Sequence, residues 1–334
     1  MTEPGLTPPG LQPQSGRTGR SRSRSVVWRR FVKPLLWIVL LLLVASAAYA
    51  AYLYFFKLDP MLDRIGTDQT VASADQASRK PYALLLLGLD TRPETGSLNT
   101  DVIMVAALNP QRKSAVVVSV PRDTYVKAAK GLPAGKANAW YAAATKGGKT
   151  SGEAVKGAFG AWLNIPIAYM ATIDFRGFED VVDALGGVRA NVDMAMRYVD
   201  KADGTNIDLQ PGEQKLSGKQ ALDFVRYRKS NQGTAESSDL ERNSRQQAIV
   251  SAIIGKLQSA SGIMRLGGVI DAAGDNVETD IPKSQLVNFL KTYAGISSDN
   301  IQYIHLGGDW RSPYIYVPAG ELAEAQKALA ATLK

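Results

Sequence analysis

The chain has 334 residues, of which 45% are hydrophobic and 21% are charged, enough for one large globular domain or two small ones. It has no cysteine, which excludes disulfides, thiolate catalysis and cysteine-ligated metal sites. Its single histidine, His305, argues against a Ser-His-Asp hydrolase and a multi-histidine zinc site. We therefore expect any bound metal to be a hard cation held by oxygen ligands.

The basic charge is concentrated at the N-terminus. The formal net charge is +8, but residues 1–33 carry seven Arg and Lys residues against one acid, which leaves +2 for the rest. This segment is rich in Pro, Gly, Ser and Arg, so we predict a disordered basic tail. The excess charge is mostly a property of that tail, and the charge distribution argues against a nucleic-acid-binding domain.

An apolar segment without charged residues, "PLLWIVLLLLVASAAYAAYLYFF", follows at residues 34–56. As a helix it spans about 33 Å, enough to cross a hydrocarbon core of about 30 Å. The basic flank predicts a cytoplasmic N-terminus and an exported chain after Lys57. A cleaved signal peptide is an alternative because "ASA" and "AYA" resemble cleavage sites, although the apolar stretch continues past both. A buried core helix fits the basic flank less well.

The pattern then predicts a stalk followed by an α/β domain. Residues 57–80 are polar and are interpreted as a stalk. Short apolar runs predict strands, and amphipathic stretches predict helices between them. The strands are expected at 82–87, 102–108, 115–120, 169–174, 224–228 and 301–306, and the helices at 138–146, 152–163, 175–185, 217–223, 241–258, 283–294 and 319–332. This order predicts a three-layer α/β/α domain over 81–334, with a central mixed sheet, preceded by one transmembrane helix.

Charged residues stand at the ends of three predicted strands. Asp90 follows the first, Asp101 begins the second, and Arg122 and Asp123 follow the third. One such pair is most often a surface salt bridge. Three together predict a polar crevice, because open α/β sheets bind ligands where strands end and loops meet.

A second cluster of arginines lies near residues 224–246. In a strand at 224–228, Arg226 and Arg228 would point to the same face. Arg242 and Gln246 are four residues apart and share a face of the following helix, for which Asp239 is a candidate cap. Arginines at a helix N-terminus suit a phosphate, although a solvated face or nonspecific polyanion binding is the plainer interpretation.

The combination of arginines with carboxylates favours phosphoryl transfer. Asp90 and Asp101 can hold Mg²⁺ against a phosphate that the arginines bind. Such a site supplies charge neutralisation, positioning and an activated hydroxyl.

The motifs resemble those of a known family. The order "LLLLGLDTR", "NTDVIMVAALNPQRKSAVVVSVPRDTYV", "KANAWYA", "DFRGFEDVVDALGGV", "ALDFVRYRK" and "DLERNSRQQ" resembles the LytR-CpsA-Psr family over about residues 81–258. The resemblance implies a membrane-anchored cell-envelope phosphotransferase. Such an enzyme takes a glycopolymer from a polyprenyl-pyrophosphate lipid and attaches it to peptidoglycan through a phosphodiester.

The resemblance also implies residue roles. The carboxylates of Asp90 and Asp101 would bind Mg²⁺, and Arg122 and Asp123 would lie beside the site, where Asp123 or a metal-bound aspartate accepts the hydroxyl proton. The pyrophosphate clamp would consist of Arg226, Arg228, Arg242 and Gln246, with Arg92, Lys136, Arg245, Asn138 and Asp239 also matching the motifs. An apolar channel is expected for the lipid, and His305 lies outside every matched motif. The implied partners are the lipid-linked glycopolymer, peptidoglycan and the membrane, with no specific nucleic acid.

Two departures from the family pattern leave alternatives open. Asn99 stands where the family usually has an arginine, and Glu241 stands where it usually has a glycine. A noncatalytic polyprenyl-phosphate binder and a pyrophosphatase that uses water as acceptor therefore stay open. A membrane-tethered transcription regulator is a further alternative, but residues 1–33 contain no helix-turn-helix pattern.

Overall fold

The computed structural model describes residues 33–334, apart from residues 93–96, 147–148, 202–203 and 294–295. The chain divides into two units, Met1–Tyr52 and Leu53–Lys334. Helix α2 (Lys33–Leu53) begins a helical stretch, Ile38–Ile65, that is long and apolar enough to cross a membrane, as predicted for this region. The predicted disordered tail, up to residue 32, lies outside the described residues.

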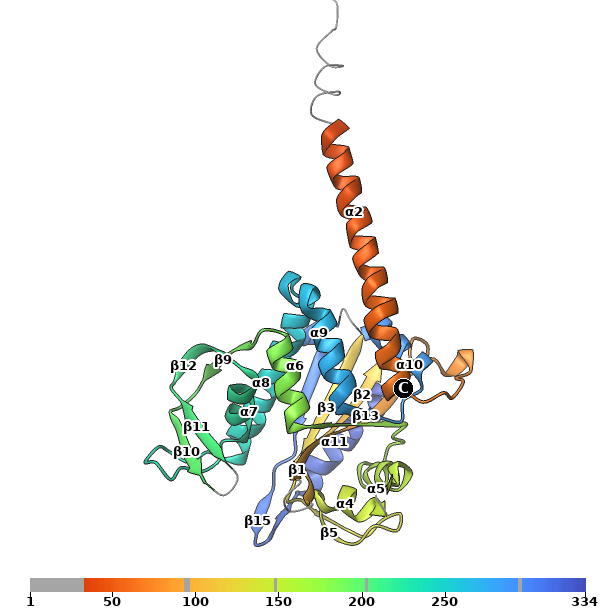
Figure 1. The fold of residues 1–334 in the computed structure, drawn as a ribbon. Helices are drawn as coiled ribbons and strands as arrows, with labels where there is room; N and C mark the ends of the chain where they lie inside the picture. The colour runs from red at the N-terminus through yellow and green to blue at the C-terminus, as the bar shows by residue number, and fades with distance from the viewer. Residues whose placement is uncertain (1–32, 93–96, 147–148, 202–203, 294–295) are drawn as a thin grey trace, which may run out of the picture. The chain divides into compact units, whose positions relative to one another are not determined.

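The second unit is built on a six-stranded mixed sheet in the order β13–β8–β1–β2–β3–β14 (Figure 1). Strands β1 and β3 run antiparallel to β2 between them, while β8 and β14 pair in parallel with β1 and β3, respectively. Strands β1, β3, β8 and β14 therefore all end at the same edge of the sheet. The strands are β1 (Tyr82–Arg92), β2 (Ser97–Asn109), β3 (Ser114–Val120), β8 (Tyr169–Asp174), β13 (Val277–Thr279) and β14 (Ile301–His305).

One face of the sheet holds the main hydrophobic core under α4 (Ala139–Ala144), α5 (Gly152–Leu163) and α11 (Ala319–Thr332). Successive side chains of a strand point to opposite faces, so Leu85 and Leu87 of β1 both enter this core. Trp140 of α4 and Phe159 of α5 meet edge to face, with ring centroids 4.9 Å apart. These helices cover one face of the sheet, so a cavity can form only on its other face.

The other face lies under α6 (Phe175–Ala184), α7 (Gly218–Arg226), α8 (Asp239–Gln258) and α9 (Ala260–Asn276). A second core packs α6, α7 and α8 against two ribbons, β9 (Val188–Val192) with β12 (Gly212–Leu216) and β10 (Met196–Asp200) with β11 (Thr205–Leu209). A Cβ on Gly218 would lie 2.2 Å from the carbonyl oxygen of Glu179, so only glycine allows α6 and α7 to approach this closely. The predicted three-layer α/β/α architecture is confirmed.

Residues 57–80 are predicted as a stalk, but much of this segment packs on the domain. A π-helical turn (Tyr54–Leu58) leads into α3 (Asp59–Ile65), which contacts α9 and α10 (Lys283–Tyr293). Leu62 is buried, and Lys57 Nζ lies 2.5 Å from a carboxylate oxygen of Asp271. Burial of apolar residues at helical spacing explains why this segment joins the domain.

Most predicted elements are confirmed to within a few residues, but the strand at 224–228 is wrong. Helix α7 continues to Arg226, and Tyr227 is its C-cap. A capping box between Ser217 and Gln220 starts this helix, and its apolar side chains are buried at helical rather than alternating spacing. The N-cap of α8 is Ser238 rather than the predicted Asp239. No element was predicted for α9 or for the ribbons β9–β12.

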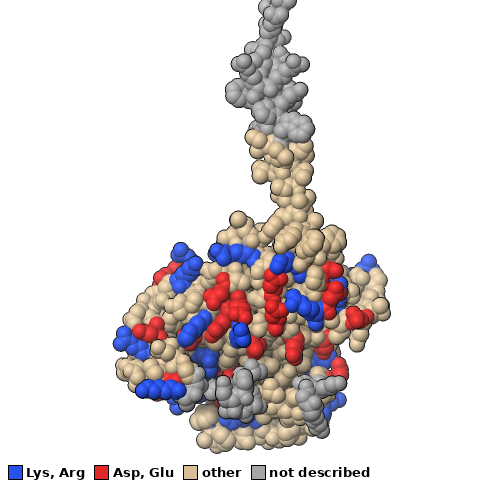
Figure 2. Space-filling model, viewed as in Figure 1, with Lys and Arg blue, Asp and Glu red and all other residues tan. Residues whose placement is uncertain are grey.

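Short elements complete the described chain. They are β4 (Tyr125–Val126), β5 (Gly135–Lys136), β6 (Thr145–Lys146), β7 (Lys149–Thr150), β15 (Asp309–Arg311), β16 (Tyr314–Tyr316) and the 3₁₀ turns Ser73–Asp75 and Ser298–Asn300. On the face shown in Figure 2, acidic and basic side chains are intermixed across the region of α6, α9 and α10. Among the residues described on that face, the basic side chains form no continuous surface of the kind that binds a nucleic-acid backbone.

Candidate functional site

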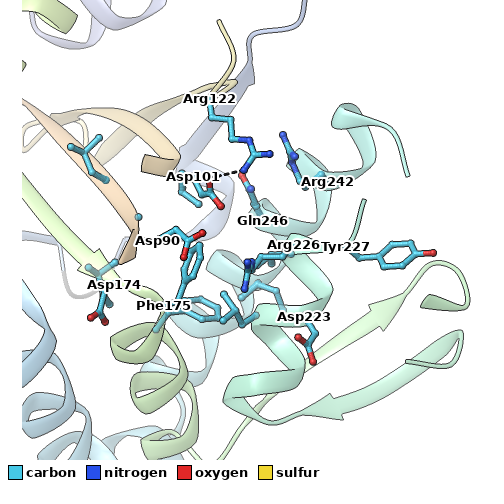
Figure 3. A pocket seen from close by; sticks show the side chains of 18 of the residues that line it. Asp90, Asp101, Arg122, Asp174, Phe175, Asp223, Arg226, Tyr227, Arg242 and Gln246 are labelled. Carbon is cyan, nitrogen blue, oxygen red and sulfur yellow. Dashed lines mark hydrogen bonds and ion pairs between the residues drawn. The ribbon is translucent and has the colours of Figure 1, made fainter. Parts of the chain in front are cut away.

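A cavity of about 760 Å³ lies between the second face of the sheet and helices α6, α7 and α8. Its lining includes charged side chains from the strand ends and from the helices, drawn together in Figure 3. The rest of the lining is largely apolar and includes Leu86, Val102, Met104, Ile173, Phe178, Ile249, Val250 and Val277. The cavity thus joins a charged region to an apolar one.

The carboxylates of Asp90 and Asp101 both line the cavity, Asp90 by regular alternation along β1 and Asp101 because of an irregularity in β2. Gly88 pairs with Val102 and Leu89 pairs with Thr100, so Asp101 is the extra residue of a β-bulge. In a regular strand Asp101 would share the core face with Ile103. The bulge instead allows Asp101 and its neighbour Val102 both to line the cavity.

Arg122 connects the cavity to the end of β3. Its Nη1 donates a hydrogen bond to Asp101 Oδ1 at 2.7 Å (Figure 3). Its Nε lies 3.6 Å from Asp123 Oδ2. Burial alone would lower the pKa of Arg122, but the two carboxylates outweigh burial and raise it. The predicted meeting of three strand ends in one polar crevice is therefore present.

Arg226 and Arg228 reach the cavity from a helix end rather than from a strand. Arg226 is the last residue of α7, and Arg228 lies two residues further in the loop that follows. The guanidinium of Arg226 stacks over the ring of Phe175, 4.5 Å from its centroid (Figure 3). Tyr227, which lies between the two arginines in the sequence, is buried, and its hydroxyl donates a hydrogen bond to the carbonyl of Ala235. This anchoring orients the two arginines without a strand.

Arg242 and Gln246 line the cavity from the first turns of α8, as their spacing predicts. Glu241 completes a capping box, accepting a hydrogen bond from the backbone N–H of Ser238 at 2.7 Å. These hydrogen bonds from Ser238 lower the pKa of Glu241. The acid that replaces the family glycine therefore serves the start of the helix that presents Arg242.

Two predicted residues, Asp123 and Lys136, stand beside the cavity rather than in its lining. Lys136 Nζ donates to Asp123 Oδ1 at 2.7 Å, and Asp123 is 7% exposed. The carboxylate of Asp123 therefore lies between Lys136 and Arg122. In this position Asp123 can orient the guanidinium of Arg122.

Arg245 points away from the cavity and is 3% exposed. Its Nε and Nη2 donate to the two carboxylate oxygens of Asp193 at 2.8 and 2.6 Å, and its Nη1 donates to Ser237 Oγ at 2.9 Å. A longer hydrogen bond reaches the carbonyl of Tyr227. Arg245 thus ties α8 to the loop that carries Arg228.

Three further predicted residues have other surroundings. The side chain of Arg92, at the end of β1, lies outside the described side chains. Asn138 occupies the N-cap position of α4 without a side-chain capping hydrogen bond. His305 Nε2 lies 3.2 Å from Gln247 Oε1, and burial lowers the pKa of His305.

The carboxylates that line the charged region fit one kind of metal site. Among the residues that the structure describes, no group of three or more His, Cys, Asp or Glu side chains converges. Asp90 and Asp101 offer oxygen atoms, and Mg²⁺ commonly binds through one or two carboxylates together with substrate phosphates. The donor set therefore fits Mg²⁺ shared with a phosphorylated substrate.

Several lining residues were missed by the sequence interpretation. They include Phe175, Tyr198, Asp200 and Asp223. Burial raises the pKa of Asp223, against the opposing effect of Lys219, whose Nζ lies 2.6 Å away. Phe175 directly follows a predicted strand end, and Asp223 lies inside the quoted motif "ALDFVRYRK", but neither was given a role. The others depend on the packing of the ribbons and α7.

We expect the variant Arg245→Met to lower the free energy of unfolding by about 2 kcal/mol, because Asp193 and Ser237 lose their partner in a largely buried site. The loss should be smaller than for a fully buried pair, since the Asp193 side chain is 40% exposed. Urea denaturation measures the change. The matched control Arg197→Met removes an exposed pair with Asp208 and should cost less than about 0.5 kcal/mol. Equal losses in the two variants would contradict the role given to Arg245.

The same pair predicts a pH dependence. Burial alone would raise the pKa of Asp193, but the hydrogen bonds and charge of Arg245 lower it overall. An acid whose pKa is lowered on folding stabilises the protein above its unfolded-state pKa, and this contribution is lost as pH falls through the folded-state pKa. The stability difference between wild type and Arg245→Met should therefore shrink below about pH 3.8, the ordinary pKa of an aspartate. A difference that stays constant down to that pH would contradict the charged pairing.

Comparisons with known proteins agree with this architecture. The sequence profile of the LytR_cpsA_psr family matches residues 52–331. The chain is 30% identical over 279 residues to the polyisoprenyl-teichoic acid–peptidoglycan teichoic acid transferase TagV of Bacillus subtilis, covering 81% of this chain and 68% of that protein. The crystal structure of B. subtilis TagV superposes with a TM-score of 0.61, covering 76% of this chain and 97% of that one at 30% identity.

Two further proteins are similar. The chain is 31% identical over 300 residues to the polyisoprenyl-teichoic acid–peptidoglycan teichoic acid transferase TagU of Bacillus mycoides, covering 86% of this chain and 93% of that protein. A structure of TagT bound to LI-WTA superposes with a TM-score of 0.59 at 26% identity, covering 81% of this chain and 96% of that one.

Proposed function

Because the chain belongs to the LytR_cpsA_psr family, we propose that it is a transferase that moves a glycopolymer from a polyprenyl-pyrophosphate lipid to peptidoglycan, forming a phosphodiester link. The observation that carries the proposal is the single cavity that joins clustered arginines and carboxylates to an apolar interior. A pyrophosphate with a polyprenyl tail has the same two parts. The names of the similar transferases TagV and TagU support the same reaction class.

Each part of the substrate has a matching set of residues. Arg226, Arg228 and Arg242 carry fixed positive charge, and a guanidinium binds phosphate oxygens through two parallel hydrogen bonds. Gln246 adds a neutral donor on the same face of α8 as Arg242. The apolar side chains of Leu86, Val102 and Met104, which line the cavity, suit the first isoprene units of the lipid.

We propose Mg²⁺ as the cofactor, held by Asp90 and Asp101. Asp101 Oδ1 accepts the hydrogen bond from Arg122, so Oδ2 is the oxygen assigned to the metal. When bound, Mg²⁺ would neutralise charge that develops on the phosphate oxygens. Arg122 would hold Asp101 in place while facing the same phosphate.

The reaction is an in-line displacement at phosphorus. The sugar hydroxyl oxygen forms a bond to the phosphorus nearer the glycan, and the bond to the bridging oxygen breaks, so that lipid phosphate leaves with the electron pair. The hydroxyl proton passes to a carboxylate that lines the cavity, Asp90 or Asp101. We assign Asp123 to the positioning of Arg122, because it lies beside the cavity between Arg122 and Lys136.

The proposed topology is a single-pass membrane protein with a cytoplasmic N-terminus and an extracytoplasmic domain. It rests on the apolar helix and on the seven basic residues that precede or begin it. Reporter enzymes fused to the C-terminus, one active only outside and one only inside the cytoplasm, test it. A cytoplasmic C-terminus would contradict this topology and would favour the alternative of a membrane-tethered transcription regulator.

Mass spectrometry of the products tests the reaction directly. The full chain in detergent micelles is incubated with a polyprenyl-pyrophosphoryl oligosaccharide, peptidoglycan fragments and Mg²⁺. The expected product is oligosaccharide phosphate attached to a peptidoglycan sugar. Free oligosaccharide phosphate, with and without acceptor, would instead identify a pyrophosphatase. Lipid binding without any product would identify a noncatalytic binder.

We expect the variant Asn99→Arg to lower the KM for the lipid-linked donor by about three- to tenfold, the effect of one added charge-assisted hydrogen bond. Asn99 pairs directly with Asp90 in the β1–β2 ladder, so both side chains lie on the same face of the sheet. Steady-state kinetics measures the change. In the matched control Asn206→Arg, the same charge is added on the exposed surface of β11. An equal gain in the control, or none at Asn99, would contradict a phosphate contact at this position.

A further inference from the structure

Three tyrosines form a partly exposed aromatic surface, here called the aromatic shelf, next to the charged end of the cavity. Tyr125 of β4 meets Tyr314 and Tyr316 of β16, with ring centroids 5.2 and 5.3 Å away. The three rings are partly exposed, and the guanidinium of Arg311 lies over Tyr316 at 5.5 Å. Nothing in the transfer reaction described above uses these residues.

The shelf is one face of a small sheet. A parallel bridge between Thr124 and Ile315 joins the pair β4–β5 to the pair β15–β16. Thr124 and Ile315 are buried, so the face with Tyr125 and Tyr316 is the outer one. Alternation places Trp310, which pairs with Ile315, on the face opposite the tyrosines.

The shelf is held rigidly. The backbone N–H of Ile315 donates to the carbonyl of Asp123 at 2.9 Å, and the N–H of Gly307 donates to Glu321 at 3.1 Å. A Cβ on Gly308 would lie 2.4 Å from the carbonyl oxygen of Tyr316, so glycine is required for the close approach at the base of the β15–β16 hairpin. A preformed surface loses little entropy when it binds a ligand.

A chain of contacts links the shelf to the cavity. Asp101, which lines the cavity, accepts a hydrogen bond from Arg122, and Arg122 faces Asp123. Asp123 in turn accepts a hydrogen bond from Lys136, which pairs with Tyr125 across β4 and β5. Tyr125 follows Arg122 by three residues through a turn that the hydrogen bond from the Thr124 N–H to the Pro121 carbonyl closes at 3.0 Å, so the two residues lie closer than the roughly 10 Å of an extended chain. Strands β1, β3 and β14 all end at this edge, and in Figure 1 the labels β15 and β5 lie at the same end of the domain as β1.

We propose that the aromatic shelf binds the glycan of the peptidoglycan acceptor; the inference rests on the proposed function. A pyranose ring presents C–H groups on its faces and hydroxyls at its edge. The shelf matches it with partly exposed rings beside Lys136, whose side chain is 34% exposed, and with Arg311, which is 71% exposed and lies over the ring of Tyr316. In-line displacement places the attacking hydroxyl opposite the leaving lipid phosphate. With the lipid in the apolar part of the cavity, the acceptor approaches from beyond the charged end, where the shelf lies.

The test compares two faces of one hairpin. Tyr316→Ala removes a ring from the shelf, whereas Trp310→Ala removes a 54% exposed ring from the opposite face. Both full-length variants in detergent micelles are titrated by calorimetry with a soluble oligosaccharide of alternating N-acetylglucosamine and N-acetylmuramic acid. Tyr316→Ala should weaken binding by about tenfold, Tyr316→Phe should largely restore it, and Trp310→Ala should match wild type. Circular dichroism checks that each variant is folded.

Steady-state kinetics distinguishes an effect on the peptidoglycan acceptor from an effect on the lipid-linked donor. Tyr316→Ala should raise the KM for the acceptor by about tenfold and leave the KM for the lipid-linked donor unchanged. An unchanged affinity for the oligosaccharide, or a rise in the donor KM alone, would overturn the proposal. Because the calorimetric titration needs no transfer, it tests the shelf separately from the reaction. Wild-type transfer with unaltered binding in Tyr316→Ala would refute the shelf alone, while oligosaccharide binding without transfer would refute only the proposed reaction.

Discussion

Replacing Arg226 with alanine should reduce the kcat of transfer by about a hundredfold or more, because a fixed donor to the reacting phosphates is lost. Arg226 ends α7 and stacks on Phe175, so its guanidinium is oriented before the substrate binds. Arg226→Lys keeps the charge but loses the planar pair of donors, and should recover only part of the rate. Single-turnover assays with the lipid-linked donor separate chemistry from binding.

The control for this experiment is an arginine on one of the ribbons that pack against α7. Arg189 lies exposed on β9 and outside the cavity lining, so Arg189→Ala should transfer at the wild-type rate. Loss of the stacking on Phe175 costs about 1–2 kcal/mol, so Arg226→Ala should remain folded. Full activity in Arg226→Ala would remove this residue from the proposed clamp.

Replacing Asp90 with asparagine should lower the rate by about a hundred- to a thousandfold and weaken the binding of divalent metal. The carboxamide keeps the shape of the side chain but removes the charge that a hard cation requires. Mn²⁺ binding followed by electron paramagnetic resonance gives a readout that does not depend on turnover. Asp299→Asn, an exposed residue in a 3₁₀ turn, is the matched control and should change neither property.

Two outcomes would contradict the metal assignment. The first is wild-type transfer that persists at full rate after chelation of divalent cations. The second is Mn²⁺ affinity that is the same in Asp90→Asn as in the control. The related variant Asp101→Asn is less diagnostic, because it also removes the charge opposite Arg122.

Most strands of the sheet could be anticipated because they follow from patterns along the chain. Apolar runs that end in Asp90 and Arg122 predict strands that deliver charge to one edge, and β1 and β3 do end there. The spacing of Arg242 and Gln246 predicts one helix face, and both line the cavity. The apolar segment predicts a helix able to cross a membrane, as found. These features depend on local periodicity, which a sequence displays directly.

Other features required the tertiary structure. Alternation alone would send Asp101 into the core, and only a bulge in the pairing of β2 with β1 turns it to the cavity. Residues 224–226 look like a strand, but the burial of α7 against α6 and the ribbons makes them the end of a helix. Local propensity decides neither case, because packing between distant segments outweighs it.

The arginines illustrate the same limit most clearly. The sequence by itself determined that Arg242 and Arg245 share a helix beside a charged site, together with the positions of five of the six sheet strands along the chain and the apolar N-terminal helix. Only the tertiary structure decided that Arg242 lines the cavity, while Arg245 pairs with Asp193, which lies 52 residues away along the chain. The physical reason is that a guanidinium binds whichever anion the fold brings to it. Which anion arrives depends on packing between segments that local sequence patterns do not relate.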